Sequence, residues 1–289
     1  MAFIKCEHCG YIITNGAQVC PDCGSPISKK QDGGKKMWIF AIIIAALFII
    51  GGTVAALLSQ SHENKGTRYQ LGMQHYDARN YDKAIEYLKP LAEEGNAEAQ
   101  FCVGCCYQFD NRAGKKNLVE AVKWYSKAAL QGNVKAQYNL GTCYENGFGI
   151  EKDWVKAIQW YRAAAEQGYY KAQFNLAYFY YHGDSIQQSY VEAAKWFKKS
   201  AEQGCKEAQF EIGWCYERGE GVEQNGEEAI NWYKKAAEQG LTDALCRLGE
   251  CYEQGIGVEK DEEEAIKWYT KSSEQGYVEA MQALIRLKK

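Results

Sequence analysis

The chain has 289 residues, of which 46% are hydrophobic and 25% are charged, so it is long enough to bury a sizeable core. Its formal net charge of -3 excludes a global positive field that would draw the whole chain onto nucleic acid or anionic lipid. With 21 Tyr, 8 Trp and only 3 Pro, the composition favours ordered structure in which large aromatic residues recur in a pattern.

Two pairs of cysteines, each separated by two residues, open the chain. The four residues are Cys6, Cys9, Cys20 and Cys23. Such pairs place four thiolates around one tetrahedral ion, which predicts a structural zinc site with no position left for water. A disulfide pair is the alternative, and His8 is an alternative ligand. Residues 1–28 resemble the short zinc ribbons at the N-termini of many bacterial membrane proteins, chiefly through CPDCG at 20–24.

A basic linker at 29–36 leads into an uncharged apolar segment at 37–58. At about 1.5 Å per residue this segment reaches roughly 33 Å, enough for one transmembrane helix. A signal peptide is the alternative, but a clear cleavage site is missing. Four lysines precede the segment, whereas Lys65 and Arg68 follow it within 10 residues. The positive-inside rule therefore predicts a single-pass protein, in the bacterial inner membrane, with a cytoplasmic N-terminus and an exported C-terminal region. The reverse orientation is the alternative.

After a linker at 59–66, one pattern recurs every 36 residues. Its tryptophans are Trp124, Trp160, Trp196, Trp232 and Trp268, each followed by Tyr or Phe. In the unit at 134–168, Ala136 and Leu140 lie on one face of a first helix. A loop with two glycines follows, Asp153 is the expected N-cap of a second helix, and Gly168 ends that helix. Each unit is thus predicted to be a helix hairpin that buries its apolar stripe by stacking on its neighbours, with Trp filling the gaps.

The unit AQYNLGTCYENGFGIEKDWVKAIQWYRAAAEQG resembles the Sel1-like repeat, a relative of the tetratricopeptide repeat (TPR) with a longer loop. Five such repeats are expected at 95–277. The hairpin at 67–94 has a shorter spacing, which predicts a TPR-like N-terminal cap, and 278–289 is the expected C-terminal capping helix. The loops QFDNRAGKKN and YHGDSIQQSY depart from the pattern and predict irregular turns. The expected fold is therefore an all-α solenoid of Sel1/TPR-type helix hairpins, preceded by a transmembrane helix and a small zinc ribbon.

This resemblance implies a scaffold rather than an enzyme, with a partner protein or peptide in a concave groove lined by the first helices. Positions of these helices that lie off the packing face vary from repeat to repeat, as expected of a surface matched to an irregular ligand. The predicted partner-binding residues are Asn139, Asn175, Tyr178, His182, Glu211, Trp214, Arg218 and Arg247. Tyr178 and Trp214 are the predicted anchors. The alternative is a set of solvent-exposed residues without a partner.

Two other functional classes remain open. Some cysteine-rich members of the resembled family are associated with β-lactam chemistry, so a cell-envelope hydrolase is one alternative. However, no serine has a lysine three residues on, which leaves that chemistry without its usual nucleophile and base. A self-assembling structural protein is the other alternative. Equivalent positions on adjacent helices are too far apart for a disulfide, so Cys106, Cys143, Cys215 and Cys251 are predicted to be free core thiols. Free thiols weigh against an exported domain.

Overall fold

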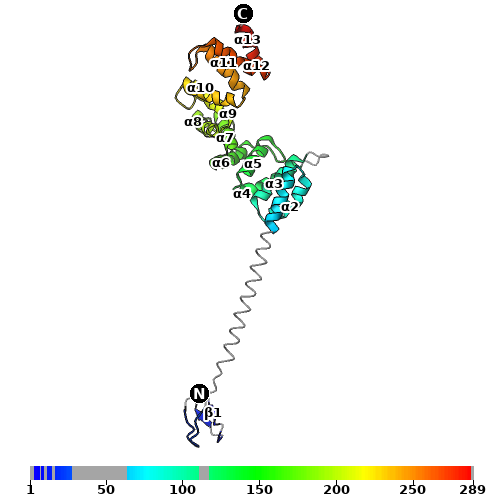
Figure 1. Ribbon diagram of the computed structural model, residues 1–289, viewed down its shortest axis with the longest axis vertical. Coiled ribbons are helices and arrows are strands. Elements are labelled where there is room, and N and C mark those ends of the chain that lie inside the picture. Colours follow the sequence, from blue (N-terminus) through cyan, green and yellow to red (C-terminus); the bar gives the residue numbers. More distant parts are fainter. Residues whose placement is uncertain are drawn as a thin grey trace. The chain divides into compact units, whose positions relative to one another are not determined.

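A computed structural model describes residues 3–6, 8, 9, 12–14, 17–27, 64–110 and 117–287 (Figure 1). The chain divides into two compact units, Met1–Asn64 and Lys65–Lys289. The membrane span predicted at 37–58 lies outside the described residues. Of the helices that the structure describes, none combines the length and the apolar character needed to cross a bilayer.

The first unit contains a two-stranded antiparallel sheet. Strand β1 (Phe3–Lys5) pairs with β2 (Ile12–Thr14), and Ile4 lies opposite Ile13. Ile13 packs with Cys6 and Cys20 in a small core. A core of this size cannot hold a segment in one conformation without a metal ion or a disulfide.

The second unit is a series of helix hairpins. A helix at 64–77 pairs with α2 (Tyr81–Glu93). The first helices of the following hairpins are α3 (Ala97–Phe109), α5 (Val134–Asn146), α7 (Tyr170–His182), α9 (Lys206–Arg218) and α11 (Thr242–Gln254). The second helices are α4 (Leu118–Leu130), α6 (Trp154–Glu166), α8 (Tyr190–Glu202), α10 (Gly226–Glu238) and α12 (Glu262–Glu274). Helix α13 (Val278–Leu287) follows, and each helix packs on the next in sequence, so the predicted all-α solenoid is confirmed.

Local signals set the ends of these helices. The first helices α5, α7, α9 and α11 end at glycines in the left-handed conformation, as α5 does at Gly147 with φ 75°, whereas α3 ends at Asp110. Second helices start at a side-chain cap: Asp153 Oδ1 accepts the backbone N–H of Lys156 at 2.9 Å, which confirms the predicted N-cap. Asn117, Ser189, Asn225 and Asp261 cap the other second helices in the same way.

The deepest core position belongs to the aromatic residue that follows each tryptophan. The rings of Tyr125, Tyr161, Phe197, Tyr233 and Tyr269 are 0–1% exposed. Trp124, Trp196 and Trp232 are buried as predicted, whereas Trp160 and Trp268 are only half-buried. The tryptophan row is therefore a less uniform part of the core than the sequence predicted, because in each repeat the neighbouring ring occupies the space between the two helices.

The loop of the third full repeat is more regular than predicted. Gly149, Gly221 and Gly257 have φ between 68° and 77° at the second glycine of the other loops. Ser185 takes the same place with φ 57°, although serine disfavours this conformation. Ser185 therefore has the same positive φ as the glycines of the other loops, and the prediction of an irregular turn in YHGDSIQQSY was wrong at this residue. Residues 111–116 of the other unusual loop lie outside the described residues.

Candidate functional site

The four N-terminal cysteines form a compact cluster. The Sγ atoms of Cys6, Cys9, Cys20 and Cys23 all lie within 4.8 Å of one another. The Sγ–Sγ distance is 3.8 Å for Cys6 and Cys23 and 3.5 Å for Cys9 and Cys20. Four sulfurs at about 2.3 Å from a zinc ion in a tetrahedron are about 3.8 Å apart. The donor set therefore fits one four-coordinate zinc ion.

Hydrogen bonds around the cluster favour the thiolate form that a metal requires. Backbone N–H groups of Cys9 and His8 lower the pKa of Cys6. A hydrogen bond with the Ser25 hydroxyl, at 3.3 Å between Sγ and Oγ, lowers the pKa of Cys23 to about 6. His8, the alternative ligand, is exposed and is not part of the cluster.

A second candidate site runs along the first helices. We count positions from the buried alanine that starts each repeat, for example Ala136, and call the surface made by the fourth, seventh and tenth positions the first-helix surface. Its fourth positions are Cys102, Asn139, Asn175, Glu211, Arg247 and Ala283; its seventh positions are Cys105, Thr142, Tyr178, Trp214, Glu250 and Arg286; its tenth positions are Gln108, Glu145, Tyr181, Glu217 and Glu253. Side chains meet across neighbouring repeats, as when Arg247 contacts Glu217.

Tyrosine hydroxyls from the second helices reach this surface. Tyr161 donates to Glu145 at 2.5 Å, Tyr233 donates to Glu217 at 2.9 Å, and Tyr269 donates to Glu253 at 2.8 Å. Tyr125 donates in the same way to Gln108. Burial raises the pKa of these phenols, so they stay protonated donors at neutral pH. Each bond satisfies a hydroxyl whose ring lies in the core.

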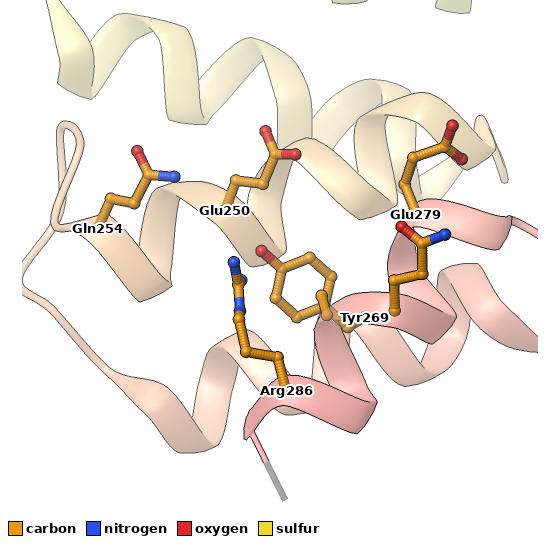
Figure 2. A pocket seen from close by; sticks show the side chains of 7 residues that line it. Glu250, Gln254, Tyr269, Glu279 and Arg286 are labelled. Atoms are coloured by element: carbon orange, nitrogen blue, oxygen red, sulfur yellow. The ribbon is translucent and has the colours of Figure 1, made fainter. Parts of the chain in front are cut away.

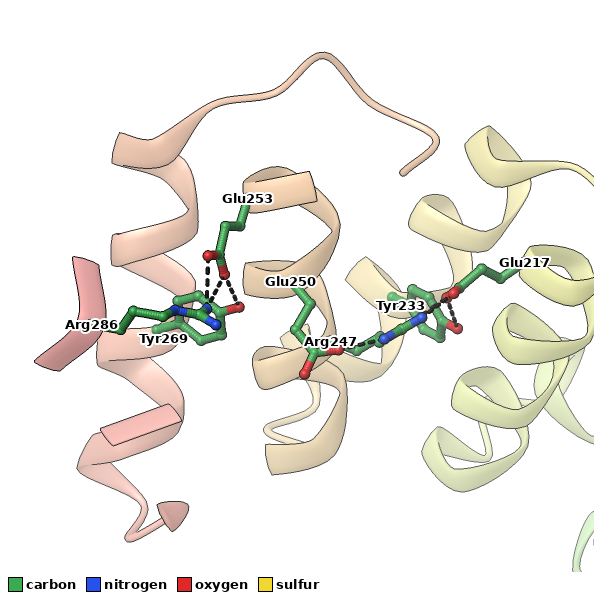
Figure 3. A network of polar contacts seen from close by, with 7 residues as sticks. All are labelled: Glu217, Tyr233, Arg247, Glu250, Glu253, Tyr269 and Arg286. Atoms are coloured by element: carbon green, nitrogen blue, oxygen red, sulfur yellow. Dashed lines mark hydrogen bonds and ion pairs between the residues drawn. The ribbon is translucent and has the colours of Figure 1, made fainter. Parts of the chain in front are cut away.

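Arg247 is the centre of the most extensive polar network on the surface (Figure 3). Its guanidinium pairs with Glu217 from α9 and with Glu250 from its own helix. Its carbon Cζ also lies 5.0 Å from the ring centre of Trp214. Further along, Arg286 from α13 donates to both carboxylate oxygens of Glu253 at 2.7 Å. Arg247 therefore has protein partners on all sides, and it supports the surface rather than offering a free cation.

The predicted anchors differ in accessibility. Tyr178 is 47% exposed, and its ring centre lies 4.2 Å from that of His182, which is also exposed. Trp214 is half-buried between the guanidinium groups of Arg247 and Arg218, the latter at 5.2 Å. Packing thus holds Trp214 in place, while Tyr178 leaves nearly half of its surface open to solvent.

The remaining predicted residues occupy the fourth positions. Asn139 lies near the hydroxyl of Tyr125 and donates to Cys105 Sγ at 4.0 Å, and Asn175 lies near the hydroxyl of Tyr161. Glu211 is half-buried, and burial together with the negative charge of Asp243 raises the pKa of its carboxyl to about 7. Six of the eight predicted residues therefore lie in the fourth- and seventh-position rows of the first-helix surface, and His182 and Arg218 lie at the eleventh position beside it.

The surface ends in a polar pocket of about 340 Å³ between α11, α12 and α13 (Figure 2). Arg286 and the Tyr269 hydroxyl point into it from one side, and Glu250 and Gln254 come from α11 on the other. Glu279 lies at its far end. These residues continue the seventh-position row and give this end of the surface both carboxylates and a cation.

Sequence reasoning missed the tenth positions. Glu145, Glu217 and Glu253 recur at multiples of the repeat period, whereas the predicted partner-binding positions are those that vary from repeat to repeat. Their regular spacing from the buried tyrosines was the available signal, since a buried hydroxyl needs an acceptor.

The cysteines of the second unit are buried. Cys106, Cys143, Cys215 and Cys251 are 0–3% exposed and form no disulfide, which confirms the prediction of core thiols. Burial raises the pKa of all four. Buried thiols with raised pKa are poor nucleophiles. In the described part of the chain, the N-terminal cluster is the one group of His, Cys, Asp or Glu side chains placed to hold a metal ion.

These features define an α-solenoid built from helix hairpins, with a variable surface on its first helices. Six segments of the chain match the Sel1 repeat family: 68–96, 97–133, 134–169, 171–205, 206–241 and 242–277. The chain belongs to the Sel1 repeat family. The match also covers the hairpin that the sequence predicted to be a TPR-like cap. Proteins of this family generally act as scaffolds in protein–protein interactions.

Solved structures agree with this assignment. A Sel1 repeat protein from Oxalobacter formigenes is 37% identical, with a TM-score of 0.69, over 74% of this chain and 88% of that one. The protein c5321, a protective antigen in uropathogenic Escherichia coli strains, is 33% identical with a TM-score of 0.72. That alignment covers 79% of this chain and 50% of the antigen, so this chain spans about half the length of c5321. No match was found among curated proteins.

Proposed function

We propose that the protein is a membrane-anchored scaffold whose first-helix surface binds a segment of a partner protein. The observation that carries this proposal is the pair of aromatic residues at neighbouring seventh positions. Tyr178 is 47% exposed, and Trp214 is held half-exposed between two guanidinium groups. Solvent-accessible aromatic rings fixed by their neighbours are typical anchors of protein interfaces.

The test is a pair of double variants compared by proximity labelling from the C-terminus of the full-length chain. Tyr178→Ala with Trp214→Ala should abolish labelling of the partner and leave the melting temperature nearly unchanged. The matched control is Trp154→Ala with Tyr190→Ala, because each of these rings is 39% exposed but lies on a second helix. Equal loss of labelling in both variants, or loss of fold in the first, would contradict the proposal.

The N-terminal unit is proposed to bind one structural zinc ion through Cys6, Cys9, Cys20 and Cys23. When bound, the ion would supply the crosslink that the small core lacks. Metal analysis of the purified full-length chain should find one zinc per chain, and Cys9→Ser should lower this content strongly. Cys143→Ser, which removes a buried thiol of the repeat unit, is the matched control and should leave the zinc content unchanged.

The anchor is proposed to be residues 37–58, with the N-terminus in the cytoplasm and the repeats exported. The thiols that weigh against export are buried with raised pKa, so oxidation would be slow. A reporter active only in the cytoplasm should work when fused before Met1 and fail after Lys289. The opposite pair of results would establish the reverse orientation.

A further inference from the structure

Glu211 is the one charged fourth-position side chain of the central repeats that the described protein groups leave without an opposite charge. Asn139 and Asn175 are neutral amides near tyrosine hydroxyls, and Arg247 pairs with Glu217. No hydrogen bond or ion pair reaches the Glu211 carboxylate from residues 64–110 or 117–287. A half-buried carboxylate without a protein partner keeps only part of its hydration, so a cation that pairs with it is favoured.

The cause is a local change in the repeat. The second-helix ring before Glu211 is Phe197, which has no hydroxyl, whereas Tyr161 occupies the equivalent place before Asn175. The tenth residue of the same repeat, Tyr181, has a hydroxyl, but it donates to Glu220 in the next loop at 2.6 Å. The row of hydroxyl donors along the first-helix surface is therefore interrupted at Glu211.

The surroundings of Glu211 favour a cation. Burial raises the pKa of the Glu211 carboxyl, and Asp243 adds negative charge that raises this pKa further. Fourth-position side chains contact the seventh position of the preceding repeat, as Arg247 contacts Trp214 and Asn139 contacts Cys105. By the same register we expect Glu211 to lie next to Tyr178, whose exposed ring can stack on an alkyl chain or a guanidinium.

We propose that the first-helix surface between α7 and α9 takes a lysine or arginine side chain of the bound segment, with the cation paired to Glu211 and the stem lying on Tyr178. This inference rests on the proposed function and names the chemistry of the partner. It requires a cation because Arg247, the other charged fourth-position residue, is already paired with Glu217, while no described donor reaches the Glu211 carboxylate. The bound cation then takes the place of the hydroxyl donor that Phe197 lacks, and it balances the negative charge of Glu211.

The test uses the full-length chain in detergent as bait for a phage-displayed random-peptide library. Selected peptides are synthesised in their original form and with each Lys or Arg replaced by norleucine or citrulline. We expect the selected peptides to share a basic residue, and we expect its replacement to weaken binding about tenfold, the effect of one charge-assisted pair. Glu211→Gln should weaken the original peptide equally and leave binding of the neutral peptide unchanged.

Glu192→Gln is the matched control, because the carboxylate of Glu192 lies on the second helix α8, off the first-helix surface, and already pairs with Lys195. This variant should keep the preference for the basic residue. Peptides that bind without any basic preference, or a preference that survives Glu211→Gln, would overturn this inference and leave the scaffold function standing. A library that yields no peptide dependent on Tyr178 and Trp214 would overturn both.

Discussion

The glycine at the sixth position of the first helices sets the spacing within each hairpin, and Gly213 gives the sharpest test of this. A Cβ atom on Gly213 would lie 2.7 Å from Cε1 of Tyr233 and 3.2 Å from the carbonyl oxygen of Ala229. The Tyr233 ring is 0% exposed and its hydroxyl is held by Glu217 at 2.9 Å, so it cannot turn away freely. Gly213→Ala should therefore force the two helices apart.

Two effects of this substitution oppose each other. Alanine raises helix propensity by about 1 kcal/mol over glycine, while overpacking a tight core costs about 1–3 kcal/mol. We expect the overpacking to win, with a net loss of up to about 2 kcal/mol in the free energy of unfolding. The third full repeat shows how the chain tolerates a methyl at this position: Ala177 faces Phe197, whose ring has no hydroxyl to hold it.

The double variant Gly213→Ala with Tyr233→Phe recreates that natural pair. Freed from Glu217, the ring can shift, so the double variant should lose about 1 kcal/mol less than the sum of the single losses. Urea unfolding of the full-length chain, followed by circular dichroism, measures the stability of the wild type, the two single variants and the double variant. If the losses of the two single variants add without a difference, or if Gly213→Ala is as stable as the wild type, the Tyr233 ring moves without breaking its hydrogen bond with Glu217. Either result would refute the reasoning.

Trp196→Ala, at a site 8% exposed, should lower the free energy of unfolding in urea by about 3–5 kcal/mol, and the half-buried Trp160→Ala by clearly less. Ser185→Gly should raise stability in the same assay by about 1 kcal/mol because its φ is 57°, whereas Gly221→Ser should lower it. Burial raises the pKa of Glu211 from 4.5 to about 7, so its stabilising effect is complete below pH 4.5 and is lost as the pH rises through 7. In Glu211→Gln the free energy of unfolding should fall by about 1–2 kcal/mol less over this pH range, allowing for partial solvent screening. An unchanged pH profile would contradict the raised pKa of Glu211.

The helix hairpins and their ends could be predicted because their signals are local. Asp153 caps α6 through its own side chain, and Gly147 ends α5 through its own backbone conformation. A period of 36 residues then places every equivalent side chain at once. Stacking of hairpins follows from the apolar stripe that each unit cannot bury alone.

Contacts between repeats could not be predicted in the same way. Gln137 is 6% exposed, donates to the carbonyl oxygen of Ala129 at 3.2 Å and accepts from Gln167 at 2.7 Å. Glutamine recurs at this position of the repeat, but a polar side chain by itself predicts a surface position. Only the structure shows that the amide bridges two hairpins. The same limit applies to the first-helix surface, since the hydroxyl of Tyr161 and the carboxylate of Glu145 come from different helices.

The contrast between the two sets of cysteines has a practical consequence. The repeat-unit thiols are Cys102, Cys105, Cys106, Cys143, Cys205, Cys215, Cys246 and Cys251, all buried and all with pKa raised by burial. Cys9 and Cys23 are exposed. Since alkylating reagents attack accessible thiolates, a brief maleimide treatment of the native chain would modify the N-terminal cysteines first. The mass added during this treatment would give the number of N-terminal cysteines that no bound metal ion protects.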